Sequence, residues 1–262
     1  MNLSIIVLAK QVPDTRCVGQ GTLNADGTIN RTALPVIINP DDMKALEQAL
    51  RLKEQYPGST IQVLTMGPVR ATEVVREGLF RGADGGRLLS DCAFAGADTL
   101  ATSYVLATAI SKMGAYDLIL CGRQAIDGET AQVGPQVAER LGVPQITYAE
   151  DILHVSDGHI IIKRRIDNGT EVVKAPMPCV ITVDSSAAPC RPRHAKLLMS
   201  HKNTPITTWD AAAIDADLTQ CGLVGSPTRV RTVESAVHHA KESRVMGCCD
   251  EEIEELMKEL EL

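Results

Sequence analysis

The sequence predicts a doubly wound α/β fold, in which a mostly parallel sheet carries antiparallel hairpin additions and an extended C-terminal arm. With 262 residues, 44% of them hydrophobic and 23% charged, the chain is long enough to bury a sizeable core. Helical patterns separate short apolar runs, as they do in parallel sheets. The runs lack the alternation of half-exposed strands, which is typical of strands covered on both faces. They are Leu3–Ala9, Ile61–Met66, Asp117–Cys121 and Cys179–Val183.

The expected helices are placed by their start and stop signals. The best-defined one begins with Asn39 as N-cap and Pro40 in the first position. Asp41 and Asp42 then face the positive end of the helix dipole, and the apolar residues that follow recur with helical spacing. Three more helices are expected over residues 69–80, from 98 or 99 to 114, and 134–142.

Two segments break the strand–helix alternation. A D-G turn predicts a hairpin within residues 23–28, and residues 152–176 have the pattern of an antiparallel meander with D-G and N-G turns. Such additions often border a parallel sheet. After residue 184 comes a basic stretch, and from residue 205 to 250 there are scattered turns without a periodic stripe.

Charge and cysteine usage exclude several classes of protein. The net charge is −7, and because residues 250–262 carry −6 of it, the rest of the chain sums to −1. An acidic chain is poorly suited to nucleic acid, and no apolar run reaches the roughly 20 residues of a membrane span. The N-terminus lacks the basic start of a secretory signal. The eight cysteines form no C-x-x-C pair, so neither a metal site nor a dithiol centre is indicated and a reduced, cytoplasmic setting is expected.

The strongest signal for a site is the polar segment from Gly122 to Pro135, GRQAIDGETAQVGP. It follows an expected strand, and open α/β sheets bind ligands at the carboxyl ends of their strands. Backbone N–H groups of residues 132–134, beside a helix start, suit a phosphate. Arg123 offers a charged contact, and Gln124 or Asp127 a contact to ribose or base. The alternative is a surface loop whose glycines only form turns. A conventional NAD(P) domain is disfavoured because no G-x-G-x-x-G follows the first strand.

Several longer segments carry a family resemblance. They are VLAKQVPDT, INPDDMKALEQALRLKE, VLTMGP followed by VREGLFRGAD, DLILCGRQAIDGETAQVGPQVAERLG, IKRRIDNGTEVVKAPMPCVITVD and PRHAKLLMSHK. In them the chain resembles the small (β) subunit of electron-transfer flavoproteins along nearly its whole length.

The resemblance implies an adenine-nucleotide site. By matching position its residues are Leu8, Ala9, Asn39, Pro40, Asp41, Asp42, Met66, Gly122, Arg123, Gln124, Ala125, Ile126, Asp127, Gly128, Glu129, Thr130, Ala131, Gln132, Val133 and Gly134. Simple members hold a structural AMP there. Flavin-bifurcating members hold the ADP half of an FAD whose ring accepts hydride from NADH. The wording DGETAQVGP resembles the bifurcating D-G-D-T-A-Q-V-G-P, with Glu129 in place of Asp, so FAD is favoured over AMP.

The resemblance also implies partners. The chain would pair with a larger α subunit that carries a second FAD, and pass electrons from NADH to an acyl-CoA-type dehydrogenase and to ferredoxin or flavodoxin. The alternative is a non-bifurcating subunit with AMP that scaffolds the partner's FAD and relays electrons from acyl-CoA dehydrogenases. In either role it would act only within a complex, with no catalytic residue of its own.

Two regions are expected from this resemblance. Residues 1–200 would form the nucleotide-binding domain, including a recognition loop at about 184–200 with Leu197 as the apolar anchor on the dehydrogenase. Residues 201–262 would form an arm that docks on the partner subunit. Its last helix presents one apolar stripe, made by Ile253, Leu256, Met257 and Leu260.

Overall fold

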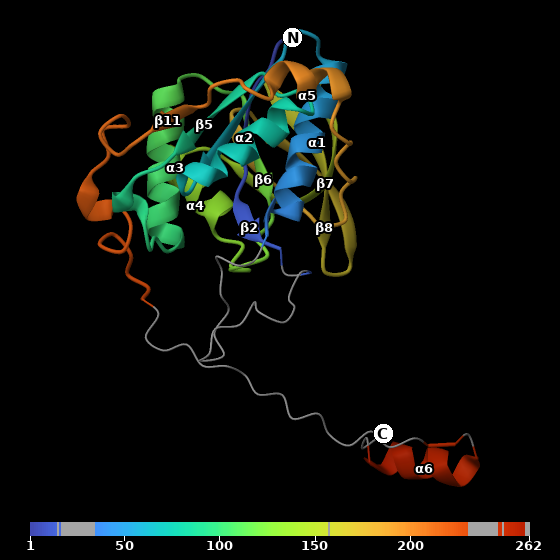
Figure 1. Ribbon diagram of the computed structural model, residues 1–262. Helices are drawn as coiled ribbons and strands as arrows, with labels where there is room; N and C mark the ends of the chain where they lie inside the picture. The colour runs from blue at the N-terminus through green and yellow to red at the C-terminus, as the bar shows by residue number, and fades with distance from the viewer. Residues whose placement is uncertain (15, 17–34, 157, 230–245, 248, 260–262) are drawn as a thin grey trace.

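One nine-stranded sheet organises the chain (Figure 1). A computed structural model describes residues 1–14, 16, 35–156, 158–229, 246–247 and 249–259. The strands of the sheet are β1 (Ser4–Leu8), β4 (Thr60–Met66), β5 (Gly85–Leu89), β6 (Leu118–Gly122), β7 (Gln145–Ser156), β8 (His159–Ile166), β9 (Gly169–Pro176), β10 (Cys179–Val183) and β11 (Thr207–Trp209). Two further strands, β2 (Gln11–Pro13) and β3 (Val36–Ile38), pair with each other.

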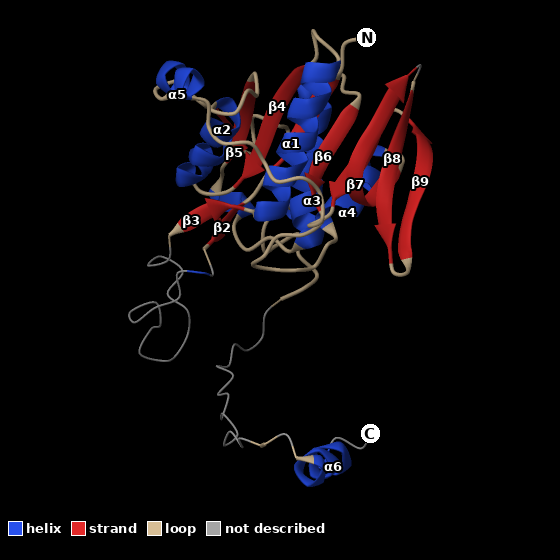
Figure 2. Cartoon of the chain, turned by 90° about the vertical axis from the view of Figure 1, so that its right-hand side faces the viewer, coloured by secondary structure: helices blue, strands red, loops and turns tan. Residues whose placement is uncertain are grey.

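The order across the sheet is β11-β5-β4-β1-β6-β10-β7-β8-β9. Neighbours from β11 to β7 are parallel, whereas β7–β8 and β8–β9 are antiparallel (Figure 2). The chain leaves β1 toward β4 and β5, and then crosses to β6 on the other side of β1. The strand order therefore reverses between β1 and β6, which makes this pair the topological switch point.

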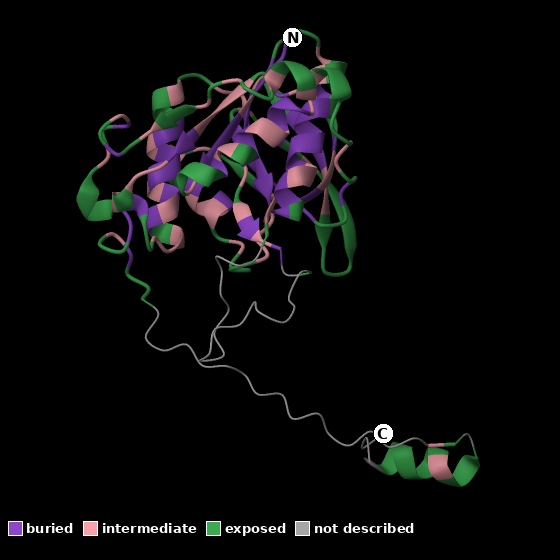
Figure 3. Ribbon diagram, in the orientation of Figure 1, coloured by how far each residue is buried: buried purple, intermediate pink, exposed green. Residues whose placement is uncertain are grey.

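Helices cover both faces of the sheet. The helices are α1 (Pro40–Gln55), α2 (Thr72–Leu79), α3 (Thr99–Met113), α4 (Val133–Leu141), α5 (Ala195–His201) and α6 (Asp250–Glu259), with short 3₁₀ turns at Val69–Ala71, Cys92–Phe94 and Leu218–Gln220. Ile5 and Val7 of β1 pack with α1 and α2, whereas Ile6 and Leu8 pack with α3 and α4. Figure 3 shows the buried strands between these helices. The predicted doubly wound α/β class is confirmed.

The structure refines several predicted elements. The meander is antiparallel, as expected, but β7 begins at Gln145 rather than at residue 152. The helix expected over residues 69–80 is a 3₁₀ turn followed by α2. No sequence pattern indicates β5 or β11, because β5 begins with two glycines and β11 has three residues. The hairpin expected within residues 23–28 lies outside the described residues.

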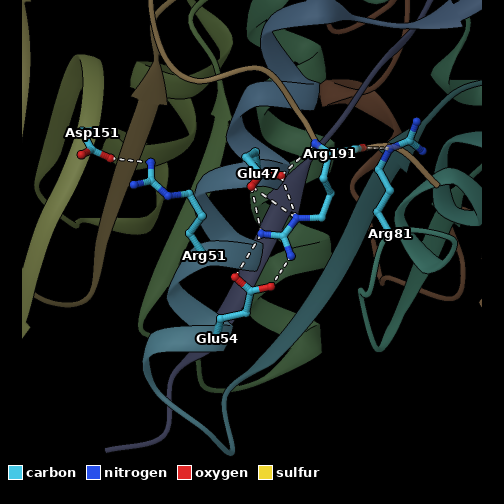
Figure 4. A network of polar contacts seen from close by, with 6 residues as sticks. All are labelled: Glu47, Arg51, Glu54, Arg81, Asp151 and Arg191. Carbon is cyan, nitrogen blue, oxygen red and sulfur yellow. Dashed lines mark hydrogen bonds and ion pairs between the residues drawn. The ribbon is translucent and has the colours of Figure 1, made fainter. Parts of the chain in front are cut away.

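A polar network holds the segment between β10 and α5 against the body (Figure 4). The Arg191 guanidinium lies between two acids of α1: its Nη2 is 2.9 Å from Oε1 of Glu47, and Nη1 pairs with Glu54. The backbone N–H of Arg191 donates to Glu47 at 3.0 Å, and Arg81 Nε donates to the Arg191 carbonyl at 3.1 Å. Just before α5, the N–H of His194 donates to the carbonyl of Phe80 at 2.8 Å. The start of α5 is thereby fixed next to α1 and α2.

Candidate functional site

A cavity of about 640 Å³ lies at the carboxyl ends of β1, β4 and β6, at the switch point of the sheet. Its walls are the turn after β1, the turn after β4, the long loop after β6, and the segment that enters α3. A volume of this size is typical of small-molecule and cofactor sites. The topology therefore places a ligand-sized cavity where doubly wound sheets bind ligands.

Asp42, in the first turn of α1, joins two of these walls. Its Oδ2 accepts the backbone N–H of Lys10, after β1, and its Oδ1 accepts that of Gly122, at the end of β6, both at 2.8 Å. Burial raises the pKa of Asp42 to about 7, although these hydrogen bonds act to lower it. A Cβ at position 122 would lie 2.6 Å from Asp42 Oδ1, so only glycine permits this close approach.

The Asn39 side chain shapes the loop after β6. Asn39 occupies the N-cap position of α1, as predicted, but its side chain makes no capping hydrogen bond. Nδ2 donates to the carbonyl of Gln124 at 2.8 Å, and Oδ1 accepts the N–H of Ile126 at 3.1 Å. Both ends of the buried amide are therefore satisfied by backbone groups of the loop.

Two non-glycine residues of this loop have left-handed backbones. Glu129 has φ 51° and Ala131 φ 54°, a conformation uncommon outside glycine. Gln132, next to Ala131, is right-handed, with φ −102° and ψ −29°. Adjacent residues of opposite hand turn their N–H groups into a concavity that binds anions. Because α4 begins directly afterwards, at Val133, the helix dipole adds to this preference.

Side-chain contacts tie the loop to neighbouring walls. Lys10 Nζ pairs with Asp127 Oδ1 at 2.7 Å, which links the loop to the end of β1. Thr99 Oγ1, at the start of α3, donates to Gln132 Oε1 at 2.8 Å. Strained backbone persists only where surrounding contacts determine it. These contacts, together with those of Asn39, hold the loop in its left-handed conformation.

Arg123 offers unused hydrogen-bond donors to the cavity. It lines the cavity, yet its guanidinium has no hydrogen bond or ion pair with any described residue, and its Nε is buried. Its Cζ lies 5.8 Å from the ring centroid of Tyr148. Burial raises the pKa of Asp41, and the positive charges of Lys44 and Arg123 offset part of this rise. A forked cation with free donors fits a phosphate-bearing ligand.

The structure brings most of the predicted site residues to the cavity. Those that line it are Leu8, Ala9, Asp42, Met66, Gly122, Arg123, Gln124, Ala125, Gly128, Glu129, Thr130, Ala131, Gln132, Val133 and Gly134. The predicted residues outside the lining are Asn39, Pro40, Asp41, Ile126 and Asp127. Two of these stabilise the loop without lining the cavity: Asn39 through its hydrogen bonds to the loop backbone, and Asp127 through its ion pair with Lys10.

One wall was missed by sequence reasoning. The lining residues outside the predicted site set are Lys10, Gln11, Leu64, Gly67, Pro68, Phe94, Gly96, Ala97, Asp98, Thr99, Thr102, Leu106 and Cys121. Four of them lie between β5 and α3, and three more lie in the first half of α3. The helix start expected at residue 98 or 99 is part of this wall, because the Asp98 carboxylate caps α3 by accepting the N–H of Ala101 at 3.0 Å, but its position at the cavity was not predicted.

The described residues contain no helix long and apolar enough to span a membrane. Nor do they contain a group of three or more His, Cys, Asp or Glu side chains placed to hold a metal ion.

Fold and cavity together define the class: a doubly wound α/β protein with a ligand-sized cavity at its switch point. Residues 26–214 match the model of the electron transfer flavoprotein domain. The chain is 46% identical to the caffeyl-CoA reductase-Etf complex subunit CarD of Acetobacterium woodii (87% of this chain, 86% of the relative). It is 46% identical to the electron transfer flavoprotein subunit beta of Megasphaera elsdenii (88% and 87%). It is 41% identical to the acryloyl-CoA reductase electron transfer subunit gamma of Anaerotignum propionicum (98% of each). The chain belongs to the electron-transfer flavoprotein family, as a subunit of the β type.

The raised pKa of Asp42 predicts a pH dependence of stability. The folded-state value of about 7 exceeds the ordinary 3.8, so between these values the folded chain holds a proton that the unfolded chain releases. The contribution of Asp42 to the free energy of unfolding is therefore present below about pH 4 and falls as pH rises to about 7, by up to about 4 kcal/mol. Asp42→Asn cannot titrate. Urea unfolding from about pH 4 to about pH 7 should show the free energy of unfolding of wild type falling relative to that of the variant. A difference between the two that stays constant with pH would contradict the raised pKa of Asp42.

Proposed function

We propose that this chain is the small subunit of a heterodimeric electron-transfer flavoprotein and binds the ADP half of an FAD in the cavity. The observation that carries the proposal is that several hydrogen-bond donors without protein partners lie at the same cavity. The Arg123 guanidinium is unpaired among the described residues, and the concavity at Ala131–Gln132 adjoins the start of α4. Buried or half-buried donors without partners are costly, and an anionic ligand satisfies them.

The walls have matching roles in this proposal. The N–H groups of residues 132–134 hold a phosphate, and Arg123 adds a charged contact. Leu8 and Met66 offer an apolar surface to the adenine, with the fully buried Leu64 behind them. A bound flavin would supply the hydride and electron chemistry, while this chain binds and orients it.

We further propose that the complex is of the bifurcating kind. Electrons from NADH would pass to a dehydrogenase or reductase of the acyl-CoA type and to a low-potential acceptor, ferredoxin or flavodoxin, with a second FAD on the larger α subunit. Support comes from the DGETAQVGP wording of the loop and from two relatives whose names place them with caffeyl-CoA reductase and acryloyl-CoA reductase. In the competing function the chain is a scaffold with a structural AMP. The two functions differ in the nucleotide that the cavity retains, which is FAD in the first and AMP in the second.

Gly128→Val tests the site. A Cβ at this position meets no atom within 4 Å, so the substitution leaves the fold intact, but the valine side chain takes up space in the cavity that Gly128 lines. We expect the purified complex to retain several-fold less nucleotide, measured by chromatography of the nucleotide released on denaturation. Gly128→Ala, with one methyl group, is the matched control and should lose less. Wild-type nucleotide content in Gly128→Val would show that this loop does not bind the cofactor.

Leu197→Ala tests docking of the dehydrogenase on α5. Leu197 is half-buried, whereas Met199 on the same helix is 77% exposed. If Leu197 is the anchor, its removal loses roughly 2–3 kcal/mol of apolar contact. Electron transfer to the dehydrogenase should then weaken by tens of fold at limiting concentration, while NADH-linked flavin reduction stays unchanged. A larger loss in Met199→Ala than in Leu197→Ala would move the anchor to Met199, and equal loss of both activities would indicate misfolding.

The C-terminal arm is proposed to dock on the larger subunit through α6. Ile253, Leu256 and Met257 are 43%, 40% and 48% exposed, and Leu260 of the predicted stripe lies outside the described residues. An isolated helix of this length is marginal in water, so it needs a surface. Truncation after Cys249 should leave the chain folded and weaken the heterodimer in sedimentation at low micromolar concentration.

A point variant separates the stripe from the charge of the helix. Leu256→Ser should weaken the heterodimer, whereas Glu254→Ser, on the same helix, should have little effect. If the truncated chain keeps its affinity for the larger subunit while its own melting temperature falls, the stripe packs on this chain and the docking proposal is wrong.

A further inference from the structure

Tyr148, on β7, has a backbone that its side chain disfavours. Its φ is 59°, in the left-handed region, where a bulky non-glycine residue is an outlier. Strain of this kind is kept where it serves a site. The Tyr148 side chain is also exposed, at 38%, so burial of the ring does not account for the strain.

A bulge in the sheet produces this conformation. In the β7–β10 pair, Ile146 faces Ile181 and Ala149 faces Val183, so two residues of β7 stand opposite Thr182 alone. Thr182 Oγ1 accepts the Tyr148 N–H at 3.2 Å and so replaces the missing ladder hydrogen bond. Bulges beside functional sites redirect a side chain.

The redirected ring lies over Arg123, with the Arg123 Cζ 5.8 Å from its centroid. The Tyr148 hydroxyl makes no hydrogen bond to any described residue, so the ring face is the part of the side chain that is used. Two acids, Asp41 and Asp184, lie near enough to feel the Arg123 charge, but neither forms an ion pair with it among the described residues. The aromatic face is therefore the contact that orients the guanidinium.

We propose that Tyr148 is a positioning residue that holds Arg123 toward the second phosphate of a nucleoside diphosphate, so that the cavity prefers diphosphates to monophosphates. The proposal rests on the nucleotide function proposed above. The N–H groups at the start of α4 bind the first phosphate, and Arg123, at the opposite end of the same loop, binds the second. The planar guanidinium fork matches phosphate oxygens only when its orientation is fixed, which gives the strained tyrosine its role.

The test compares ADP with AMP as probes on the full-length chain freed of nucleotide, by titration calorimetry. Wild type should bind ADP about tenfold or more tighter than AMP, the range of a charged hydrogen-bonded contact. Tyr148→Asn removes the ring with a residue that tolerates the left-handed backbone, so the fold should persist. It should lose the ADP preference with AMP affinity unchanged. Tyr148→Phe, which keeps the ring, is the matched control and should keep the preference.

A second variant separates positioning from structure. In an Arg123→Ala background, Tyr148→Asn should change ADP affinity no further, because the ring acts through Arg123. An ADP preference that survives in Tyr148→Asn, or equal losses of ADP and AMP affinity, would overturn the inference. So would wild type that binds both nucleotides equally. Absence of binding of either nucleotide to the wild-type chain would instead overturn the nucleotide function itself.

Discussion

The buried carboxylate of Asp42 joins the elements on which the cavity depends. It lies at the start of α1 and accepts the N–H groups of Lys10, two residues after β1, and of Gly122, the last residue of β6. These two strands flank the switch point, where the chain leaves in opposite directions. Because both strand ends are bound to one side chain, the loops that leave them start from fixed positions. Gly122 is required for this approach, since any Cβ there would overlap α1.

The loop after β6 then takes a conformation that its own sequence does not favour. Glu129 and Ala131 are left-handed although neither is glycine. Contacts from three places in the fold determine the loop: Asn39 just before α1, Lys10 just after β1, and Thr99 at the start of α3. Tertiary contacts thus offset the strain. The left-handed conformation that they maintain orients N–H groups at the helix start so that they can bind an anion.

The parts of the fold that the sequence predicts are those encoded locally. Strands β1, β4, β6 and β10 are rich in Ile, Val and Leu without strict alternation, because helices cover both their faces. The N-cap position of Asn39 was predicted, but its side-chain partners were not, because they lie 85 and 87 residues away in the chain. Tyr148 carried no signal either, since its strain arises from the pairing of β7 with β10. The loop after β6 was found by composition and family resemblance, whereas its left-handed backbones follow from contacts that only the folded chain makes.

The flavin content of the purified heterodimer tests the nucleotide assignment most directly. If this chain holds the ADP half of an FAD and the larger subunit holds another, denaturation should release two FAD per heterodimer and no AMP. The visible spectrum of the intact complex should account for the same amount of flavin. Release of one FAD and one AMP per heterodimer would contradict the assignment and make this chain a scaffold for the flavin of its partner.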